Sequence, residues 1–303
     1  MRKLFAALLA ATLLVSCAAC GGSSSGGGYR PNNTVPTVQR GEEDTYTAYN
    51  GGYKLVSCGT LYKDAASISI PTQHEGLDVV AIGEDAFSGY IKLETVDIPA
   101  TVTEIGKRAF ENCTALGRVV LPDGLVTLGG AAFQGCTALT DITFGSGITT
   151  IEGECFKGCT ALTAIEIPQT VTEIRGNCFE DCTALTAVTL HDGITAIHGY
   201  AFRGCTALET LTLPVNITEI RGNTFENCSA LRAIHIPDGV TRIAAHAFHG
   251  CAALAEVSIP ATVTEIGSSA FRECRKLLAV TIPLGATVDE RAFKDSPTEI
   301  TFR

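Results

Sequence analysis

The stretch IPATVTEIGKRAFENC, from Ile98 to Cys113, carries the pattern that decides the fold of this 303-residue chain. Its phenylalanine recurs at intervals of 23 residues, and one last phenylalanine follows after 22. A fixed period of this length indicates stacked repeats, each too small to bury its apolar side without its neighbours. The series consists of Phe87, Phe110, Phe133, Phe156, Phe179, Phe202, Phe225, Phe248, Phe271 and Phe293.

Other positions keep the same period as the phenylalanines. Cysteine stands three residues after most of them, leucine stands six residues after, and two further apolar positions follow. One unit reads L-x-x-I-x-I-P-x-x-V-T-x-I-x-x-x-A-F-x-x-C-x-x. The series run from Cys113 to Cys274, Leu93 to Leu277, Val96 to Val280 and Ile98 to Ile282.

Two spacings inside the unit predict its local structure. Val96 and Ile98 alternate with polar residues, which is typical of a short strand with one buried face. Pro99 then lacks the amide hydrogen that would extend the strand. The apolar residues Ile105, Ala109, Phe110 and Cys113 are spaced like one side of a helix. We therefore expect an α/β repeat solenoid, with a parallel β-sheet on one face and short helical or 3₁₀ turns on the other.

The pattern I-P-x-x-V-T-x-I-G-x-x-A-F-x-x-C resembles the BspA-type leucine-rich repeat of bacterial surface proteins. The resemblance covers roughly Ile82 to Val288. It implies a leucine-rich-repeat horseshoe, extracellular display and, for some relatives, adhesion to host matrix or to other cells. The shared residues are structural, so the resemblance carries over no functional residue.

The repeat pattern changes in the first and last units and at two of the turns. Tyr90 and Ser296 replace cysteine in the first and last units, as expected of coils that cap a stack. At Gly145 and His191 the proline is lost, which predicts looser turns.

By composition the chain divides into four segments. They are a lipoprotein signal peptide (1–16), a lipidated Gly/Ser-rich tether (17–40), a β-rich N-terminal cap (41–80) and a solenoid of about ten coils (81–303), the last one a cap.

The first segment has the features of an export signal. Arg2 and Lys3 precede an uncharged run of residues 4–15, which is too short to span a bilayer as a helix. Leu14-Val15-Ser16-Cys17 resembles the bacterial lipobox, so Cys17 is the expected lipidation site, with Cys20 as the alternative. The prediction is a protein anchored by lipid to the outer face of a bacterial membrane.

Net charge argues against nucleic acid as a partner. The formal charge of −10 becomes about −12 once Arg2 and Lys3 are removed with the signal. An acidic surface repels a phosphate backbone. The anchoring membrane and an extracellular partner are the contacts that the sequence predicts.

Cysteines are numerous, 13 in all, but most follow the repeat. A thiol in a repeated apolar position is expected to be buried and reduced. Stacked cysteines have Cβ vectors that point the same way, which disfavours a disulfide. Cys155 and Cys178 replace alanine one coil apart and leave a single bridge or a soft metal site open, and the redox state of Cys58 is undetermined.

Catalytic and cofactor motifs are missing from the sequence. His246 and His249 flank Phe248 without an H-E-x-x-H pattern, so they are predicted to be surface histidines and not zinc ligands. There is no phosphate loop, dinucleotide fingerprint or catalytic triad. We expect no enzyme, no cofactor and no metal; a thiol-dependent enzyme would need an exposed, low-pKa cysteine.

The outward strand positions vary while the apolar positions stay constant, which favours a binding surface. The predicted function is protein binding or adhesion, and the alternative is a glycan-binding or structural protein of the cell envelope. The partner is therefore an extracellular protein or glycan. The chain lacks tryptophan, and no aromatic residue is expected on this face. The candidate binding face consists of Arg118, Asp141, Glu166, Thr189, Thr212, His235 and Glu256.

Overall fold

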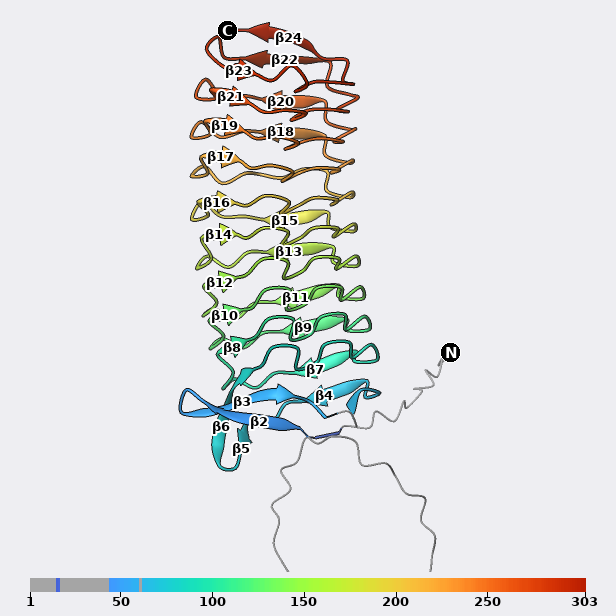
Figure 1. Cartoon of the computed structure of the whole chain (residues 1–303), viewed down its shortest axis with the longest axis vertical. Helices are drawn as coiled ribbons and strands as arrows, with labels where there is room; N and C mark the ends of the chain where they lie inside the picture. Colours follow the sequence, from blue (N-terminus) through green and yellow to red (C-terminus); the bar gives the residue numbers. More distant parts are fainter. Residues whose placement is uncertain (1–14, 17–43, 60–61) are drawn as a thin grey trace, which may run out of the picture.

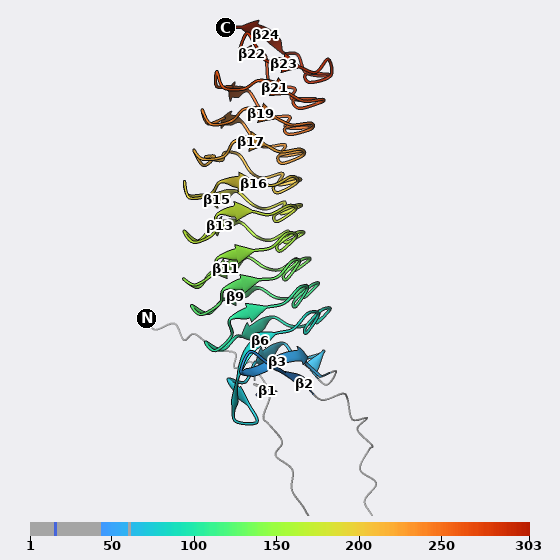
Figure 2. The same cartoon turned by 60° about the vertical axis from the view of Figure 1, so that its left-hand side comes forward.

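The computed structural model describes residues 15–16, 44–59 and 62–303, and it shows an elongated column of stacked coils (Figures 1 and 2). Each regular coil carries a strand of about three residues, a strand of two residues and a phenylalanine-containing turn. Corresponding elements of successive coils lie side by side along the column. The solenoid of parallel strands expected from the repeat is confirmed.

The longer strands form what we call the long-strand row. Between regular coils its strands pair in parallel with partners 23 residues apart, as between Val119 and Ile142 or between Ile165 and Val188. The offset is 28 residues at the first pair, β4 with β7, and 20 residues at the last, β22 with β24. In the coil without an assigned long strand, a single bridge joins Thr210 to Ala233. The row comprises β4 (Ser67–Ser69), β7 (Thr95–Asp97), β9 (Arg118–Val120), β11 (Asp141–Thr143), β13 (Ala164–Glu166), β15 (Ala187–Thr189), β18 (Ala233–His235), β20 (Glu256–Ser258), β22 (Ala279–Ile282) and β24 (Glu299–Phe302).

The two-residue strands form a short-strand row. Its second position points into the core, as Ile105 and Leu128 do in neighbouring coils. The row begins at the longer strand β6 (Leu77–Ile82). It continues with β8 (Glu104–Ile105), β10 (Thr127–Leu128), β12 (Thr150–Ile151), β14 (Glu173–Ile174), β16 (Ala196–Ile197), β17 (Glu219–Ile220), β19 (Arg242–Ile243), β21 (Glu265–Ile266) and β23 (Thr287–Val288).

The N-terminal end of the column is closed by a hairpin. Strands β2 (Thr45–Tyr49) and β3 (Gly52–Ser57) are antiparallel, and β3 pairs in parallel with β6. A second, shorter hairpin joins β5 (Gln73–His74) to β6. The two-residue strand β1 (Val15–Ser16) pairs with β4. The β6 edge of the first coil is therefore covered by β3, and β2 becomes the edge strand of that sheet.

The core is a column of stacked phenylalanine rings. Ring centroids of successive coils are 4.9 Å apart at Phe87 and Phe110 and 5.9 Å apart at Phe133 and Phe156, with the planes nearly parallel. The first nine phenylalanines of the series are fully buried. Burial of this much aromatic surface in register is the main force that holds one coil on the next.

The helical or 3₁₀ face expected from the apolar spacing is wrong. In the described coils the phenylalanine segments are successive turns, without helix. Arg108 and Asn112, two residues before and after Phe110, have φ angles of 53° and 57°, in the left-handed region. The Phe110 amide donates to Ala132 in the next coil at 2.8 Å. Hydrogen bonds within the turn, such as that from the Cys113 amide to the Phe110 carbonyl at 3.2 Å, alternate with bonds to the next coil, and the positive φ angles prevent a continuous helix.

One sequence signal for these turns was missed. The second residue after each phenylalanine has a positive φ throughout the stack. Glycine, asparagine and aspartate tolerate this conformation best, and they fill nearly every such position. The residues are Gly89, Asn112, Gly135, Gly158, Asp181, Gly204, Asn227, Gly250, Glu273 and Asp295.

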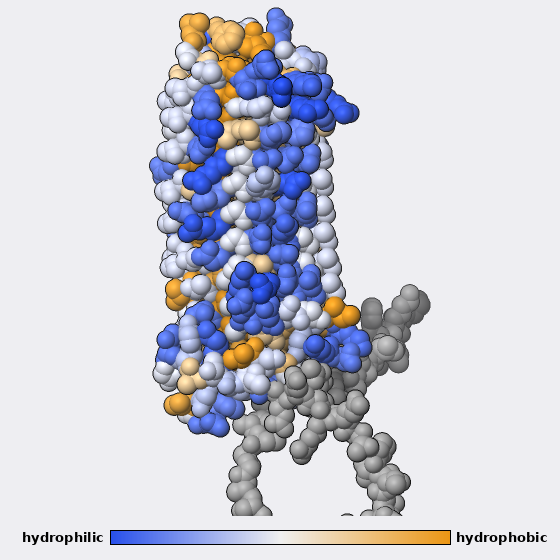
Figure 3. Space-filling model, in the orientation of Figure 1, coloured by the Kyte–Doolittle hydropathy of each residue, from blue (hydrophilic) through white to orange (hydrophobic). Residues whose placement is uncertain are grey.

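On the outer surface, hydrophilic residues form bands that run along the column, and the C-terminal end of the column is apolar (Figure 3). Leu278, Leu284 and Phe302 are all more than half exposed there. All four residues of β24 are exposed. No stretch of the described residues forms a helix with the length and hydrophobicity that crossing a membrane requires.

Candidate functional site

The outward residues of the long-strand row form one continuous face. Six of the seven candidate residues are exposed and Asp141 is half-buried, whereas the residues between them, such as Ile165 and Ile234, are buried. The alternation follows from the pleat of a strand, which sends successive side chains to opposite sides. Arg118, Asp141, Glu166 and Thr189 lie close together, and Thr212, His235 and Glu256 lie further along the stack.

The first two candidate residues neutralise each other. Arg118 Nε donates to Asp141 Oδ2 at 2.8 Å across neighbouring coils. The two side chains are 70% and 46% exposed, so solvent screens the pair and it adds little to stability. Both groups remain available to a partner.

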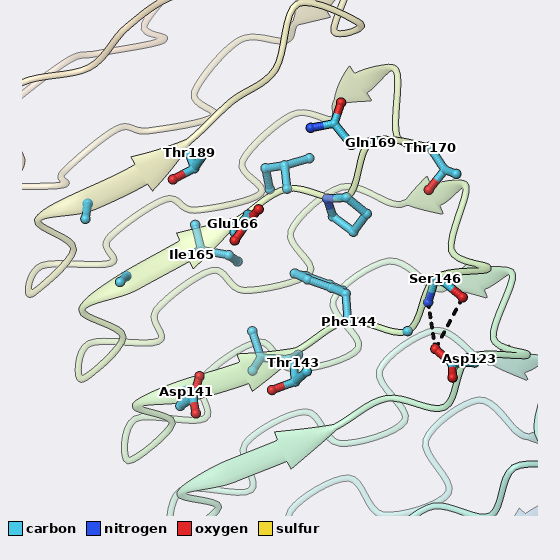
Figure 4. A pocket seen from close by; sticks show the side chains of 16 residues that line it. Asp123, Asp141, Thr143, Phe144, Ser146, Ile165, Glu166, Gln169, Thr170 and Thr189 are labelled. Atoms are coloured by element: carbon cyan, nitrogen blue, oxygen red, sulfur yellow. Dashed lines mark hydrogen bonds between the residues drawn. The ribbon is translucent and has the colours of Figure 1, made fainter.

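Two adjoining hollows open on this face. The hollow over β11, β13 and β15 has a volume of about 740 Å³. Its neighbour over β7 and β9 has a volume of about 770 Å³. Thr143, Phe144, Gly145 and Asp123 line both, so they form one groove across several coils (Figure 4). The groove brings together four of the seven candidate residues, and Thr212, His235 and Glu256 do not line it.

Phe144 lies where the two hollows meet. It replaces the isoleucine or leucine of the regular unit, and its larger ring is only partly buried. The ring meets Phe156 edge to face, with centroids 6.0 Å apart. The expectation of a face without aromatic residues is therefore wrong, because an aromatic ring from a core position also lines the groove.

Gly145, which stands in place of the usual proline, shapes the floor of the groove. A Cβ atom at Gly145 would lie 2.1 Å from the carbonyl oxygen of Pro122, so only glycine permits this close approach. Asp123 Oδ1 accepts a hydrogen bond of 3.0 Å from the Ser146 amide. The turn is thus held by a side chain of the preceding coil, where a looser turn was expected (Figure 4).

His191 fills the second proline position and also holds its turn. Its Nε2 lies 2.9 Å from the carbonyl oxygen of Pro168 in the preceding coil. Its Nδ1 accepts a hydrogen bond of 3.1 Å from the Gly193 amide. The ring therefore bridges two coils where proline would only have ended a strand.

The repeat cysteines form a buried column of thiols. Cys113 Sγ donates to the Phe87 carbonyl of the preceding coil at 3.1 Å, and the seven later cysteines of the series repeat this bond. Ser296, in the cysteine position of the last unit, donates to Phe271 in the same way at 2.7 Å. The thiol is thus a small hydrogen-bond donor in an apolar corner.

Cys155 and Cys178 lie outside this series and are also buried, and they form no disulfide within the described residues. Cys58, in the N-terminal cap, is buried as well. Burial raises the pKa of Cys155 and Cys178 well above the ordinary value. A thiolate is needed for nucleophilic attack and for soft-metal binding, so the surroundings oppose both roles.

We predict that the native thiols resist labelling. Burial raises the pKa of Cys113, Cys182 and Cys274 to about 12. The chain from Gly41 onward should therefore react with iodoacetamide at pH 8 only after unfolding in guanidinium, when all of its cysteines become labelled. Mass spectrometry of native and unfolded samples measures the difference, and rapid native labelling of any one cysteine would contradict a buried, protonated column.

We call the edge of the column formed by the phenylalanine-containing turns the turn edge. Along it, residues of alternating charge directly follow the five successive phenylalanines from Phe156 to Phe248. We call Lys157, Glu180, Arg203, Glu226 and His249 the ionic ladder. Glu180 forms two ion pairs: its Oε2 lies 2.8 Å from Lys157 Nζ, and its Oε1 lies 2.8 Å from Arg203 Nη1. Arg203 also reaches Glu226 at 3.0 Å, and His249 lies 3.2 Å from Glu226. The ladder joins five successive coils.

Glu180 is the most buried member of the ladder, with only 3% of its side chain exposed. Although burial alone would raise the pKa of this carboxyl, hydrogen bonds from Lys157, Asn177 and Arg203 hold it below the ordinary value of 4.5. A group whose folded pKa is depressed stabilises the fold above its unfolded pKa, and this contribution disappears as pH falls through the folded pKa.

We expect Glu180→Gln to reduce the pH dependence of stability. The wild type should lose free energy of unfolding between about pH 5 and the depressed folded pKa, whereas the variant should be less stable at neutral pH and change less over that interval. Urea unfolding at a series of pH values measures this. Glu166→Gln, on the exposed face of β13, is the matched control, and an equal effect of both changes would refute the role of the ladder.

The predicted lipidation sites, Cys17 and Cys20, lie outside the described residues. The described coils define a leucine-rich repeat solenoid. The family model described as BspA type Leucine rich repeat region matches residues 62–186 and 172–299, in six copies. The chain belongs to this BspA-type leucine-rich repeat family.

Comparison with solved structures supports the same fold. A leucine rich cell surface protein from Faecalibacterium prausnitzii A2-165 is 29% identical, with a TM-score of 0.61 over 86% of this chain and 87% of that chain. A leucine-rich repeat protein from Bacteroides ovatus is 22% identical, with a TM-score of 0.52 over 86% and 89%. The pneumococcal vaccine antigen PcpA is 20% identical, with a TM-score of 0.53 over 79% and 69%. A search among curated proteins finds no match.

Proposed function

We propose that the chain is a surface-displayed binding protein that uses the groove over β4 to β15 to hold an extracellular protein. The observation that carries this proposal is the pair of hollows that meet at Phe144 and Gly145. Both residues depart from the repeat where the groove opens, and both reshape its floor. A partly exposed aromatic ring between charged and hydroxyl side chains is a common composition for a protein-binding surface.

The dimensions of the groove suit an extended segment of a partner. The groove reaches from Ser67 on β4 to Thr189 on β15. Adjacent strands lie about 4.8 Å apart, so these six strands span on the order of 24 Å. Contacts spread over several coils give distributed affinity, consistent with adhesion to host matrix or to another cell.

Single-residue changes in the groove test the proposal. Thr143 is exposed and lines both hollows, so Thr143→Lys should fill them and weaken partner binding with little loss of thermal stability. Thr160→Lys, an exposed change at the turn edge, is the matched control. Surface plasmon resonance against matrix proteins, and a glycan array in parallel, measure the effect.

Two results would contradict the proposal. Full protein binding by Thr143→Lys, with loss only on changes within residues 44–82, would place the site in the N-terminal cap. Binding restricted to glycans would favour the alternative of a glycan-binding envelope protein. Phe144→Leu, which restores a regular apolar residue, would show how far the ring contributes.

Lipid anchoring at the cell surface is part of the proposal. The lipobox-like sequence before Cys17 supports it, and the similar Faecalibacterium protein is described as a cell surface protein. Cys17→Ser should release the protein from the membrane fraction, because thioether acylation needs the sulfur. Mass spectrometry of the mature N-terminus decides the site, and a start at Cys20 would overturn the choice of Cys17.

A further inference from the structure

Two histidines and one glutamate converge on the turn edge. His246 and His249 lie on either side of the buried Phe248, and Glu226 lies in the preceding coil at the position equivalent to His249. One potential ligand atom from each of the three residues falls within 4.8 Å of the other two. All three side chains are half-buried and border solvent. The sequence analysis predicted that these two histidines are surface residues and not zinc ligands.

The turn that contains Phe248 brings the two imidazole rings close together. His246 has a φ of 59°, in the left-handed region, and its amide is held by Ser268 of the next coil at 2.9 Å. The His249 amide donates to the His246 carbonyl at 3.2 Å and closes the turn. The ring centroids are 5.4 Å apart with an interplanar angle of 66°. The turn therefore places both histidines at the same part of the surface.

Glu226 is positioned by groups of its own and the preceding coil. Asn223 Nδ2 donates to Glu226 Oε2 at 2.9 Å. Arg203 Nε lies 3.0 Å from the same oxygen and also pairs with Glu180, so its charge is shared between two carboxylates. The other oxygen, Oε1, is left facing His249. Partners that orient a ligand carboxylate in this way are typical of metal sites.

The contact between His249 and Glu226 has the spacing of two ligands on one tetrahedral metal ion, and the ligand atom of His246 lies within 4.8 Å of both. Zn²⁺ binds histidine nitrogen and carboxylate oxygen at about 2.0–2.2 Å, which places two ligands of one ion about 3.4 Å apart. His249 Nδ1 and Glu226 Oε1 are 3.2 Å apart. Two nitrogens and one oxygen are the ligand types that zinc accepts, with the fourth position left to water.

We propose that Glu226, His246 and His249 bind one Zn²⁺ ion that clips two successive coils together. The glutamate comes from one coil and both histidines come from the next. Glu273 Oε1, 3.8 Å from His249 Nε2, adds negative charge beside the cluster. The ion would therefore extend the ionic ladder by a coordinate link between coils.

Zinc binding by the full chain tests this inference. After chelator treatment, calorimetric titration with ZnCl₂ should show one ion per chain, confirmed by elemental analysis of the dialysed protein. The double variant His246→Asn, His249→Arg should lose this binding. Asn177 and Asn223 already stand at the position of His246 in other coils, and Arg203 and Arg272 at that of His249, so the variant keeps side chains that the fold accepts.

His235→Asn, an exposed histidine on the long-strand face, is the matched control and should bind zinc as the wild type does. Unchanged binding by the double variant would overturn the inference, because it would place the ion elsewhere, for instance on thiols. Absence of binding by the wild type at zinc concentrations that saturate other three-ligand sites would overturn it as well. Neither result would bear on the proposed function, because the groove lies on the long-strand row and the three zinc ligands lie at the phenylalanine turns.

Discussion

Phe179→Ala should lower the free energy of unfolding by about 3–5 kcal/mol, the usual cost of emptying a fully buried aromatic site. Phe179 is fully buried, and its ring is stacked between Phe156 at 5.6 Å and Phe202 at 5.5 Å. Its removal deprives each neighbour of one of its two stacking partners and interrupts the column in the middle. Chemical denaturation followed by circular dichroism measures the loss.

Phe293→Ala is the matched control at the end of the stack. Phe293 is only partly buried, and a single neighbouring ring, Phe271, lies 5.1 Å away. Its loss should be clearly smaller, because a terminal coil contacts one neighbour and a central coil contacts two. Equal losses at the two positions would show that stability does not depend on stacking between coils.

Gly145→Pro should destabilise the protein by about 1–3 kcal/mol, the usual range for an overpacked site. The repeat alone suggests the opposite, because proline is the regular residue at this position. At Gly145, however, a Cβ atom would lie 2.1 Å from the Pro122 carbonyl oxygen, and backbone cannot move aside as a flexible side chain can. Thermal unfolding of wild type and variant measures the effect.

Gly117→Ala serves as the control for this prediction. A Cβ atom at Gly117 would meet nothing within 4 Å, and its φ is not in the left-handed region. The change should be neutral or stabilise slightly, by up to about 1 kcal/mol, through reduced freedom of the unfolded chain. A stabilising Gly145→Pro would mean that the close approach of the two coils relaxes freely.

The apolar series could be predicted from the sequence because burial repeats with the period. Phe110, Leu116 and Val119 are buried as the pattern indicated. The turns could not be predicted from apolar spacing, because Ile105, Phe110 and Cys113 all face the core whether or not a helix connects them. The sign of the backbone φ angle at flanking positions such as Asn112 decides between helix and turn. The period of the apolar residues carries no information on this angle.

The site was harder to predict than the fold. Exposure of Arg118 and Glu166 followed from strand alternation, but the groove depends on Phe144 and Gly145, two departures from the repeat whose joint effect is a matter of shape. The zinc cluster depends on side chains of two different coils. Glu226 and His249 share a position in the unit, yet only the turn geometry shows that His246 joins them.

The column of thiols has a consequence for measuring local opening. Every coil from Cys113 to Cys274 carries a buried cysteine whose thiol donates a hydrogen bond to a backbone carbonyl of the coil before it. A cysteine can react only when its own part of the stack opens, and repeat proteins open in parts as well as globally. Peptide-resolved alkylation rates would therefore give the opening free energy coil by coil, from natural probes spaced 23 residues apart.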